Sequence, residues 1–166
     1  WKVCRLTKDC SLKKLRSVSK GWDPLLVSHG DTRLFNLKPD LEIKENDETT
    51  VILDTKWKLL DESLNNGTDK YGLSQADFYQ MFAYGHKYLG GKGKLVLIYP
   101  EYDGFNKPIE HSFDFNEGLK LWVVPFDTAN QNCVSRDVLR PIIESIYVST
   151  EIGWFFIKIN SIGKHE

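Results

Sequence analysis

A strand-length run, Lys94–Tyr99, that is apolar after its first residue limits the possible folds more than any other feature of the chain. A continuous apolar run of this length is typical of a strand buried on both faces of a sheet. An amphipathic pattern before it predicts a helix over Gln75–Tyr88, with Ser74 as its N-cap. A β-branched segment, Thr50–Trp57, comes before the helix and predicts another strand. This order of strand, helix and strand predicts an α/β fold with a mixed central sheet.

The remaining segments are predicted mainly from turn signals. Leu34–Lys44 is expected to be extended, with Pro39 indicating an edge or a strand end, and to form a hairpin with Thr50–Trp57. Leu59–Gly72 is expected to be a loop, and Gly90 should end the helix. The other expected elements are a basic helix at Ser11–Val18, strands at Leu25–Ser28, His111–Phe115 and Leu119–Val124, a helix at Ile142–Val148, and a strand or further helix at Trp154–Ile159.

The composition fits one compact soluble domain. The chain has 166 residues, of which 41% are hydrophobic, and no apolar run approaches the ~20 residues that cross a bilayer. We therefore expect no membrane association, and because the chain opens at Trp1 rather than Met we expect a fragment of a longer protein. Its three cysteines, Cys4, Cys10 and Cys133, show no metal-ligand spacing, which favours a reducing cytoplasmic setting and argues against zinc.

Charge is balanced overall, with a net charge of −1, but the N-terminus is basic. The first twenty residues contain one acidic residue, Asp9, and a larger group of basic residues: Lys2, Arg5, Lys8, Lys13, Lys14, Arg16 and Lys20. Such an arm could lie along phosphates or form an ordinary solvated face, and the sequence leaves both interpretations open.

Three charged residues lie where the predicted hairpin brings strand ends together. Asp40 is near the start of one strand, and Asp54 and Lys56 are near the end of the next. Residues two apart in a strand share a face, so Asp54 and Lys56 point the same way and the hairpin can place Asp40 beside them. Unpaired charges at the end of an apolar strand are costly, and a bound cation with a phosphate would compensate all three.

These residue types suit metal-assisted phosphodiester hydrolysis. Mg²⁺ prefers oxygen ligands, which Asp40, Asp54 and the main-chain carbonyl of Thr55 could supply. Lys56 would lie beside the attacking water and offset the negative charge that develops on phosphorus oxygens. Taken separately, Asp-x-Lys is usually a surface ion pair and Pro-Asp a turn. Their combination with a hairpin and a following helix favours a catalytic site.

The predicted helix places a polar pair on the same face. Gln80 and Tyr84 are one turn apart and could reach a metal-bound water, the scissile phosphate or Lys56. Met81 and Tyr88 share this face and are interpreted as core residues.

Four segments together resemble the McrC family, the nuclease subunit of the McrBC system that restricts DNA containing modified cytosine. The resemblance covers roughly residues 25–125, and it rests on the segments Leu37–Leu41, Ile52–Lys58, Ser74–Tyr84 and Leu95–Pro100. It implies a PD-(D/E)XK (restriction-endonuclease-like) core with a mixed central sheet flanked by helices. It also implies that Asp40 and Asp54 are metal ligands, that Lys56 is the catalytic lysine, and that Gln80 and Tyr84 form the helical Gln-x-x-x-Tyr motif. Asp77 matches a position that is usually acidic in the family.

The resemblance also implies partners and a division of the chain. Residues 25–166 would form the nuclease domain, with Mg²⁺ as cofactor and Mn²⁺ as a substitute, and residues 1–24 would be the remnant of a longer upstream region. DNA would be the substrate and an McrB-like GTPase the motor subunit; the chain itself has no Gly-x-x-x-x-Gly-Lys-Ser/Thr motif.

The sequence departs from the wider superfamily in one respect. Many members have a further Glu on a helix before the first core strand, whereas residues 1–24 contain no glutamate. Glu42, two residues beyond Asp40, could substitute, but we expect it to be solvated. Two alternatives to a motor-dependent endonuclease stay open: a stand-alone RecB-like or repair nuclease, and a catalytically inactive DNA-binding scaffold of the same fold.

Overall fold

The computed structural model describes residues 15–17, 25–45, 48–115 and 118–128. The elements in this part of the chain are β1 (Leu15–Ser17), β2 (Leu25–His29), β3 (Thr32–Asn36), β4 (Leu41–Glu45), β5 (Glu48–Thr55), a 3-10 turn η1 (Lys70–Gly72), α1 (Gln75–Leu89), β6 (Gly93–Pro100), β7 (Phe113–Asp114) and β8 (Leu119–Phe126). No helix within these ranges is long and apolar enough to cross a membrane.

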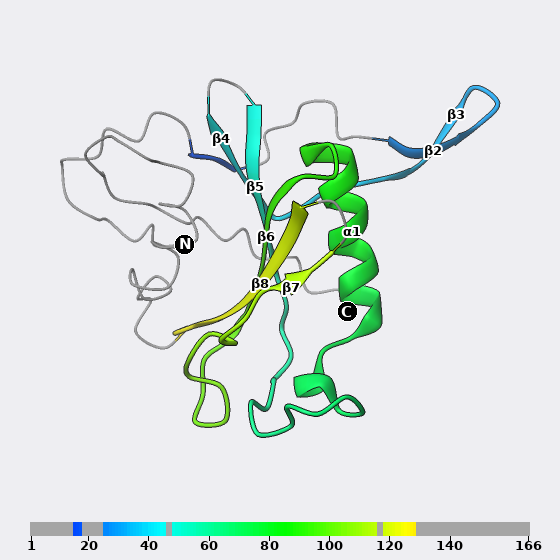
Figure 1. The fold of residues 1–166 in the computed structure, drawn as a ribbon. Helices are drawn as coiled ribbons and strands as arrows, with labels where there is room; N and C mark the ends of the chain where they lie inside the picture. Colours follow the sequence, from blue (N-terminus) through cyan, green and yellow to red (C-terminus); the bar gives the residue numbers. More distant parts are fainter. Residues whose placement is uncertain (1–14, 18–24, 46–47, 116–117, 129–166) are drawn as a thin grey trace.

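Six strands form one mixed sheet in the order β1-β4-β5-β6-β8-β7. β5, β6 and β8 run parallel, and the other neighbours pair antiparallel. The β5–α1–β6 connection is a crossover in which the helix returns the chain to a parallel strand beside the first. The α/β class and the mixed sheet are therefore confirmed, and Figure 1 shows α1 packed along one side of this sheet.

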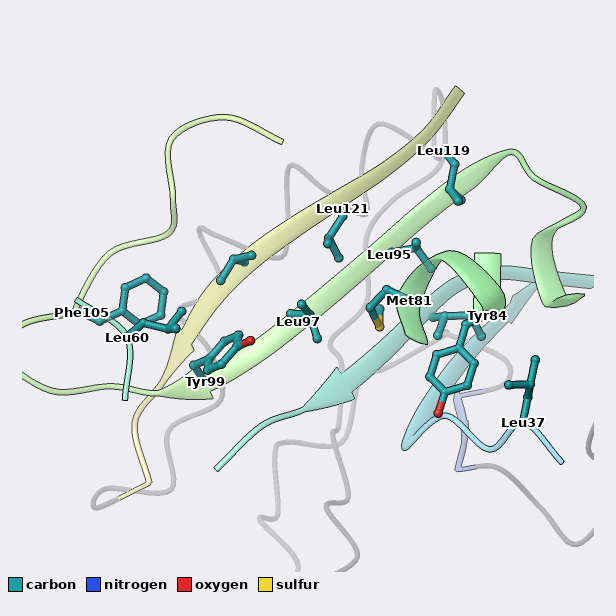
Figure 2. Packing of buried hydrophobic residues seen from close by; sticks show 12 residues of the cluster. Leu37, Leu60, Met81, Tyr84, Leu95, Leu97, Tyr99, Phe105, Leu119 and Leu121 are labelled. Carbon is teal, nitrogen blue, oxygen red and sulfur yellow. The ribbon is translucent and has the colours of Figure 1, made fainter. Parts of the chain in front are cut away.

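The core lies between α1 and the sheet. Met81, one of the buried residues of the helix, packs with Leu95 and Leu97 of β6, and all three are fully buried. Figure 2 shows Met81 beside the helix and close to Leu95 and Leu97. The helix comes close to β8 because Gly85 has no side chain, and a Cβ there would lie 2.3 Å from Leu119 Cδ2. This contact fixes the depth at which α1 sits on the sheet.

The helix ends agree with the sequence prediction. The Ser74 hydroxyl accepts a hydrogen bond from the Ala76 amide at 3.2 Å, as expected of an N-cap. Gly90 closes the helix in the left-handed conformation, with φ of 62°, which glycine adopts without strain. The helix is thereby confirmed, and it ends at Leu89, one residue later than predicted.

The predicted strands around Leu25, Lys94, His111 and Leu119 are confirmed with shifted ends. Leu34–Lys44 was expected to be one extended segment, but it contributes to two sheets. Its first part belongs to β3, which pairs with β2 in a separate hairpin that projects from the main sheet in Figure 1. Its second part forms β4, which pairs with β5 in the predicted hairpin.

The basic helix expected at Ser11–Val18 is wrong where the structure describes it. Leu15–Ser17 is strand β1, which pairs antiparallel with Leu41–Ile43 of β4. Backbone pairing with the edge of a sheet overrode a weak local helical pattern, as tertiary context often does. The elements predicted at Ile142–Val148 and Trp154–Ile159 lie outside the described residues.

Candidate active site

The end of β5 carries the first group of charged side chains. Asp54 is 4% exposed and lies two residues after Ile52, on the face of the sheet that α1 covers. The Lys56 amide donates to the carbonyl of Ile98 at 2.8 Å, so pairing with β6 continues one residue past the strand. The backbone that directs Asp54 and Lys56 is therefore fixed by the parallel sheet.

Asp40, just before β4, is joined to the same place. Its Oδ2 accepts hydrogen bonds from the Thr55 amide at 2.8 Å and from the Thr55 hydroxyl at 2.5 Å. The Asp40 backbone also adjoins the Asp54 carboxyl and acts to lower its pKa. The hairpin thus brings the two acids together, as their positions in the sequence predicted.

The Asp54 carboxyl has a pKa above its ordinary value. Burial is the largest cause, because removal from water disfavours the charged form. The negative charge of Asp40 acts in the same direction, while Lys56 and the Asp40 backbone oppose it. Additional positive charge at this place would therefore favour the ionised carboxylate.

Lys56 connects Asp54 to the helix. Its Nζ lies 2.6 Å from Asp54 Oδ2 and donates to Gln80 Oε1 at 2.6 Å. The Gln80 amide nitrogen donates to the Tyr84 hydroxyl at 2.8 Å, which donates to the Lys38 carbonyl at 2.9 Å. Burial first, and then the charge of Asp54, raise the pKa of the Tyr84 hydroxyl, so it stays a hydrogen-bond donor at neutral pH. The side chains of Asp54, Lys56, Gln80 and Tyr84 are linked in series. Asp40 adjoins them through Thr55, the residue between Asp54 and Lys56.

A second tyrosine anchors the neighbouring residue. The Tyr88 hydroxyl donates to the Leu37 carbonyl at 2.9 Å, and Figure 2 shows Tyr84 beside Leu37. The helix therefore holds the Leu37–Lys38 backbone that leads into Asp40. Met81 is fully buried and Tyr88 packs against the core, which confirms the core interpretation of both residues.

Asp77, Lys58 and Tyr99 adjoin this group, and the sequence assigned a role to none of them. The Asp77 Oδ2 accepts from the Tyr99 hydroxyl at 3.0 Å and lies 2.7 Å from Lys58 Nζ. The available signal was the position of Asp77 one helical turn before Gln80, on the same face.

Glu42 differs from the expectation. It was expected to be solvated, but it is 6% exposed. Its carboxylate accepts from the Thr49 hydroxyl at 3.0 Å and lies 3.1 Å from Lys44 Nζ. The reason is its place opposite Ile52 in the β4–β5 pair, which turns it toward the covered face of the sheet.

Any divalent ion here would depend on few protein carboxylates. Within the part of the chain that the structure describes, no three His, Cys, Asp or Glu side chains gather as a potential metal site. Asp40 and Asp54 form a pair only. Mg²⁺ commonly binds through one or two carboxylates and keeps several waters, so a pair is chemically sufficient.

Comparison with known proteins identifies the family. The family described as the McrBC 5-methylcytosine restriction system component matches residues 3–100, more than half of the chain. The chain therefore belongs to this family, and the resemblance noted in the sequence is confirmed. No match was found among curated proteins.

A solved structure to which the chain is similar is an assembly of Thermococcus gammatolerans McrB AAA+ hexamers with bound McrC. The sequence identity is 19% and the TM-score 0.47, over 68% of this chain. The chain spans 26% of the length of the chain it matches there.

Proposed function

We propose that this protein is the DNA-cleaving subunit of a McrBC-type restriction system, a Mg²⁺-dependent endonuclease with a PD-(D/E)XK core. The observation that carries the proposal is the junction of Asp40 and Asp54, with Lys56 Nζ 2.6 Å from Asp54 Oδ2. Two acids and one amine at a single strand end are the groups that metal-assisted phosphodiester hydrolysis requires.

The metal-binding role is supported by the donor set. Asp54 is a buried carboxylate whose pKa is raised by desolvation, so a cation would relieve an existing cost. Both hydrogen bonds from Thr55 go to a single oxygen of Asp40, Oδ2. Asp40, Asp54 and the Thr55 carbonyl would hold Mg²⁺, with Mn²⁺ as a substitute. When bound, the ion would polarise a phosphate oxygen and lower the pKa of a coordinated water.

The remaining residues would orient the reacting groups and offset the negative charge on the phosphate. Lys56 would offset negative charge on the phosphate as the attacking water adds. Gln80 keeps the Lys56 ammonium directed toward Asp54 by accepting a hydrogen bond from it through Oε1. The Tyr84 hydroxyl binds both Gln80 and the Lys38 carbonyl, just before Asp40. The helix would therefore position both Lys56, through Gln80, and Asp40, through the backbone before it.

Membership of the family supports the partner and the substrate. Family membership supports an McrB-like GTPase as the motor for this chain. DNA carrying modified cytosine would then be the substrate, selected by the whole system.

The test is cleavage of methylated plasmid DNA with Mg²⁺, with and without an McrB-type GTPase and GTP. We expect Asp54→Ala and Lys56→Ala to lower the rate by about a hundredfold or more. Asp114 and Lys120 are a matched control, because their side chains form an ion pair of 3.4 Å on the surface. Asp114→Ala and Lys120→Ala should cleave like the wild type.

Three outcomes separate the alternatives. Cleavage that persists in both site variants would reject the site. Full activity without a motor partner would favour a stand-alone nuclease. A folded protein that neither cleaves nor binds Mn²⁺ would favour an inactive DNA-binding scaffold.

A further inference from the structure

Asp77 is the acid through which α1 reaches both lysines that follow Asp54. It lies in the first turn of the helix, and its Oδ2 is 2.7 Å from Lys58 Nζ. Its other oxygen, Oδ1, is 3.8 Å from Lys56 Nζ. One carboxylate therefore contacts Lys58 directly and stands just outside hydrogen-bond distance of Lys56.

The Asp77 side chain is held from two further sides. Tyr99, which is 1% exposed, donates its hydroxyl to Oδ2 at 3.0 Å. Lys58 Nζ also lies over the Tyr99 ring, 5.8 Å from its centroid. Burial acts to raise the pKa of Asp77, but the Lys58 and Tyr99 hydrogen bonds and the two lysine charges outweigh it. The carboxylate is thus ionised at neutral pH and fixed in place.

Lys56 has three ammonium protons and two close partners. Asp54 and Gln80 lie 2.6 Å from its Nζ, and Asp77 is the third polar group near it. If a metal ion binds Asp54 and offsets its negative charge, the attraction between Asp54 and the Lys56 ammonium becomes weaker. Asp77 would then be the acid that still attracts the ammonium, from the helix side.

We propose that Asp77 is a positioning residue that holds the Lys56 ammonium in its working place, with Lys58 and Tyr99 locking the Asp77 carboxylate. The inference rests on the proposed function, since it assumes that Lys56 acts on a phosphate. Lys58 and Tyr99 occupy Oδ2 and leave Oδ1 facing Lys56. Asp77 would therefore act on the chemical step through Lys56, while DNA binding would not depend on it.

The test compares Asp77→Asn with Asp114→Asn in the full chain, with an McrB-type GTPase and GTP if cleavage needs them. Asp114 is the matched control because it also pairs with a lysine and a hydroxyl, Lys120 and Ser112, away from the site. Three quantities are measured: the single-turnover cleavage rate at saturating Mg²⁺ and DNA, the DNA affinity in Ca²⁺, and the melting temperature.

We expect Asp77→Asn to cleave about tenfold more slowly, as loss of an outer partner of a catalytic group typically does. Its DNA affinity should stay within about twofold of the wild type, and Asp114→Asn should match the wild type in both. An unchanged rate for a folded Asp77→Asn protein would overturn the proposal. A rate that falls only in parallel with DNA affinity or with the folded fraction would also overturn it, because Asp77 would then only stabilise the fold or the bound DNA.

Tyr99→Phe keeps the test decisive if Asp77→Asn does not fold. It removes one donor to Asp77 Oδ2 and retains both the ring and the Asp77 charge. We expect a rate about threefold lower at unchanged DNA affinity, a smaller loss than for an outer partner removed outright. A wild-type rate would overturn the proposal. Lys56→Ala in the same assay separates the two claims: if it still cleaves, the proposed function fails first, and if it is inactive while the Asp77 and Tyr99 variants are normal, only the positioning role fails.

Discussion

Lys56 at the end of β5 and Gln80 in the middle of α1 share a hydrogen bond of 2.6 Å. Because an ammonium group only donates, the Gln80 side chain must present its oxygen to Lys56 and its nitrogen to Tyr84. The order of donors and acceptors is thus fixed from the strand, through the helix, to the backbone before Asp40. This polarity makes the roles of individual residues separable by substitution.

Gln80→Leu should slow cleavage by about tenfold or more, because Lys56 loses the acceptor that directs it. Gln75→Leu is the matched control, since Gln75 is exposed on the same helix one turn or more away. Single-turnover cleavage measures both variants. Equal rates for Gln80→Leu and Gln75→Leu would show that the Lys56–Gln80 bond does not matter for catalysis.

Tyr84→Phe and Tyr88→Phe should separate catalysis from stability. Each removes a hydroxyl that donates to a backbone carbonyl at 2.9 Å, so each should destabilise the fold by about 1 kcal/mol. Only Tyr84 also accepts from Gln80, so only Tyr84→Phe should reduce cleavage beyond its loss of stability. Urea unfolding and cleavage rates test the pair. A Tyr88→Phe protein that loses as much activity as Tyr84→Phe would contradict this division.

Asp54→Asn should be more stable than the wild type near pH 8 without divalent ions. Burial raises the pKa of Asp54 in the folded state, so its ionised form costs stability at neutral pH. That cost disappears as the pH falls through the raised folded pKa, and the difference between the two proteins should shrink on acidification. Urea midpoints across this pH range measure it.

The control for this prediction is Asp114→Asn. A hydrogen bond from Ser112 is the main cause that lowers the pKa of Asp114, so neutralising this residue should not stabilise the protein near pH 8. If Asp54→Asn is instead the less stable protein near pH 8, desolvation is not the dominant influence on Asp54.

Gly85→Ala should destabilise the fold by about 1–3 kcal/mol. Its Cβ would meet the Leu119 side chain at 2.3 Å, and Leu119 is fully buried, so the helix and β8 would have to separate. Gly67→Ala is the control, because a Cβ there has no neighbour within 4 Å. The free energy of unfolding of the two variants tests this prediction. Equal values would mean that Gly85 and Leu119 are not in close contact in solution.

The sequence predicted the arrangement of these side chains where short-range geometry determines it. Asp54 and Lys56 share a face because they are two residues apart in a strand, and Asp40 joins them through an adjacent hairpin. Helical spacing likewise placed Gln80 and Tyr84 one turn apart, and Ser74 at the helix start. These relationships involve neighbours along the chain or across one turn.

The relationships that were not predicted join distant segments. The bond from Tyr84 to the Lys38 carbonyl spans 46 residues, and the Asp77–Tyr99 bond spans 22. Both depend on how deeply α1 packs on the sheet, which no local pattern specifies. Strand β1 and the burial of Glu42 were missed for a similar reason, since pairing across the sheet decided both.

Calorimetric titration with Mn²⁺ tests the central claim most directly, because it measures the metal site without requiring cleavage or a partner. We predict that the wild type binds Mn²⁺, and that Asp40→Ala and Asp54→Ala each weaken this binding by at least about tenfold while Asp114→Ala does not. Unchanged Mn²⁺ binding in folded Asp40→Ala and Asp54→Ala proteins would contradict the claim that these two carboxylates hold the catalytic ion.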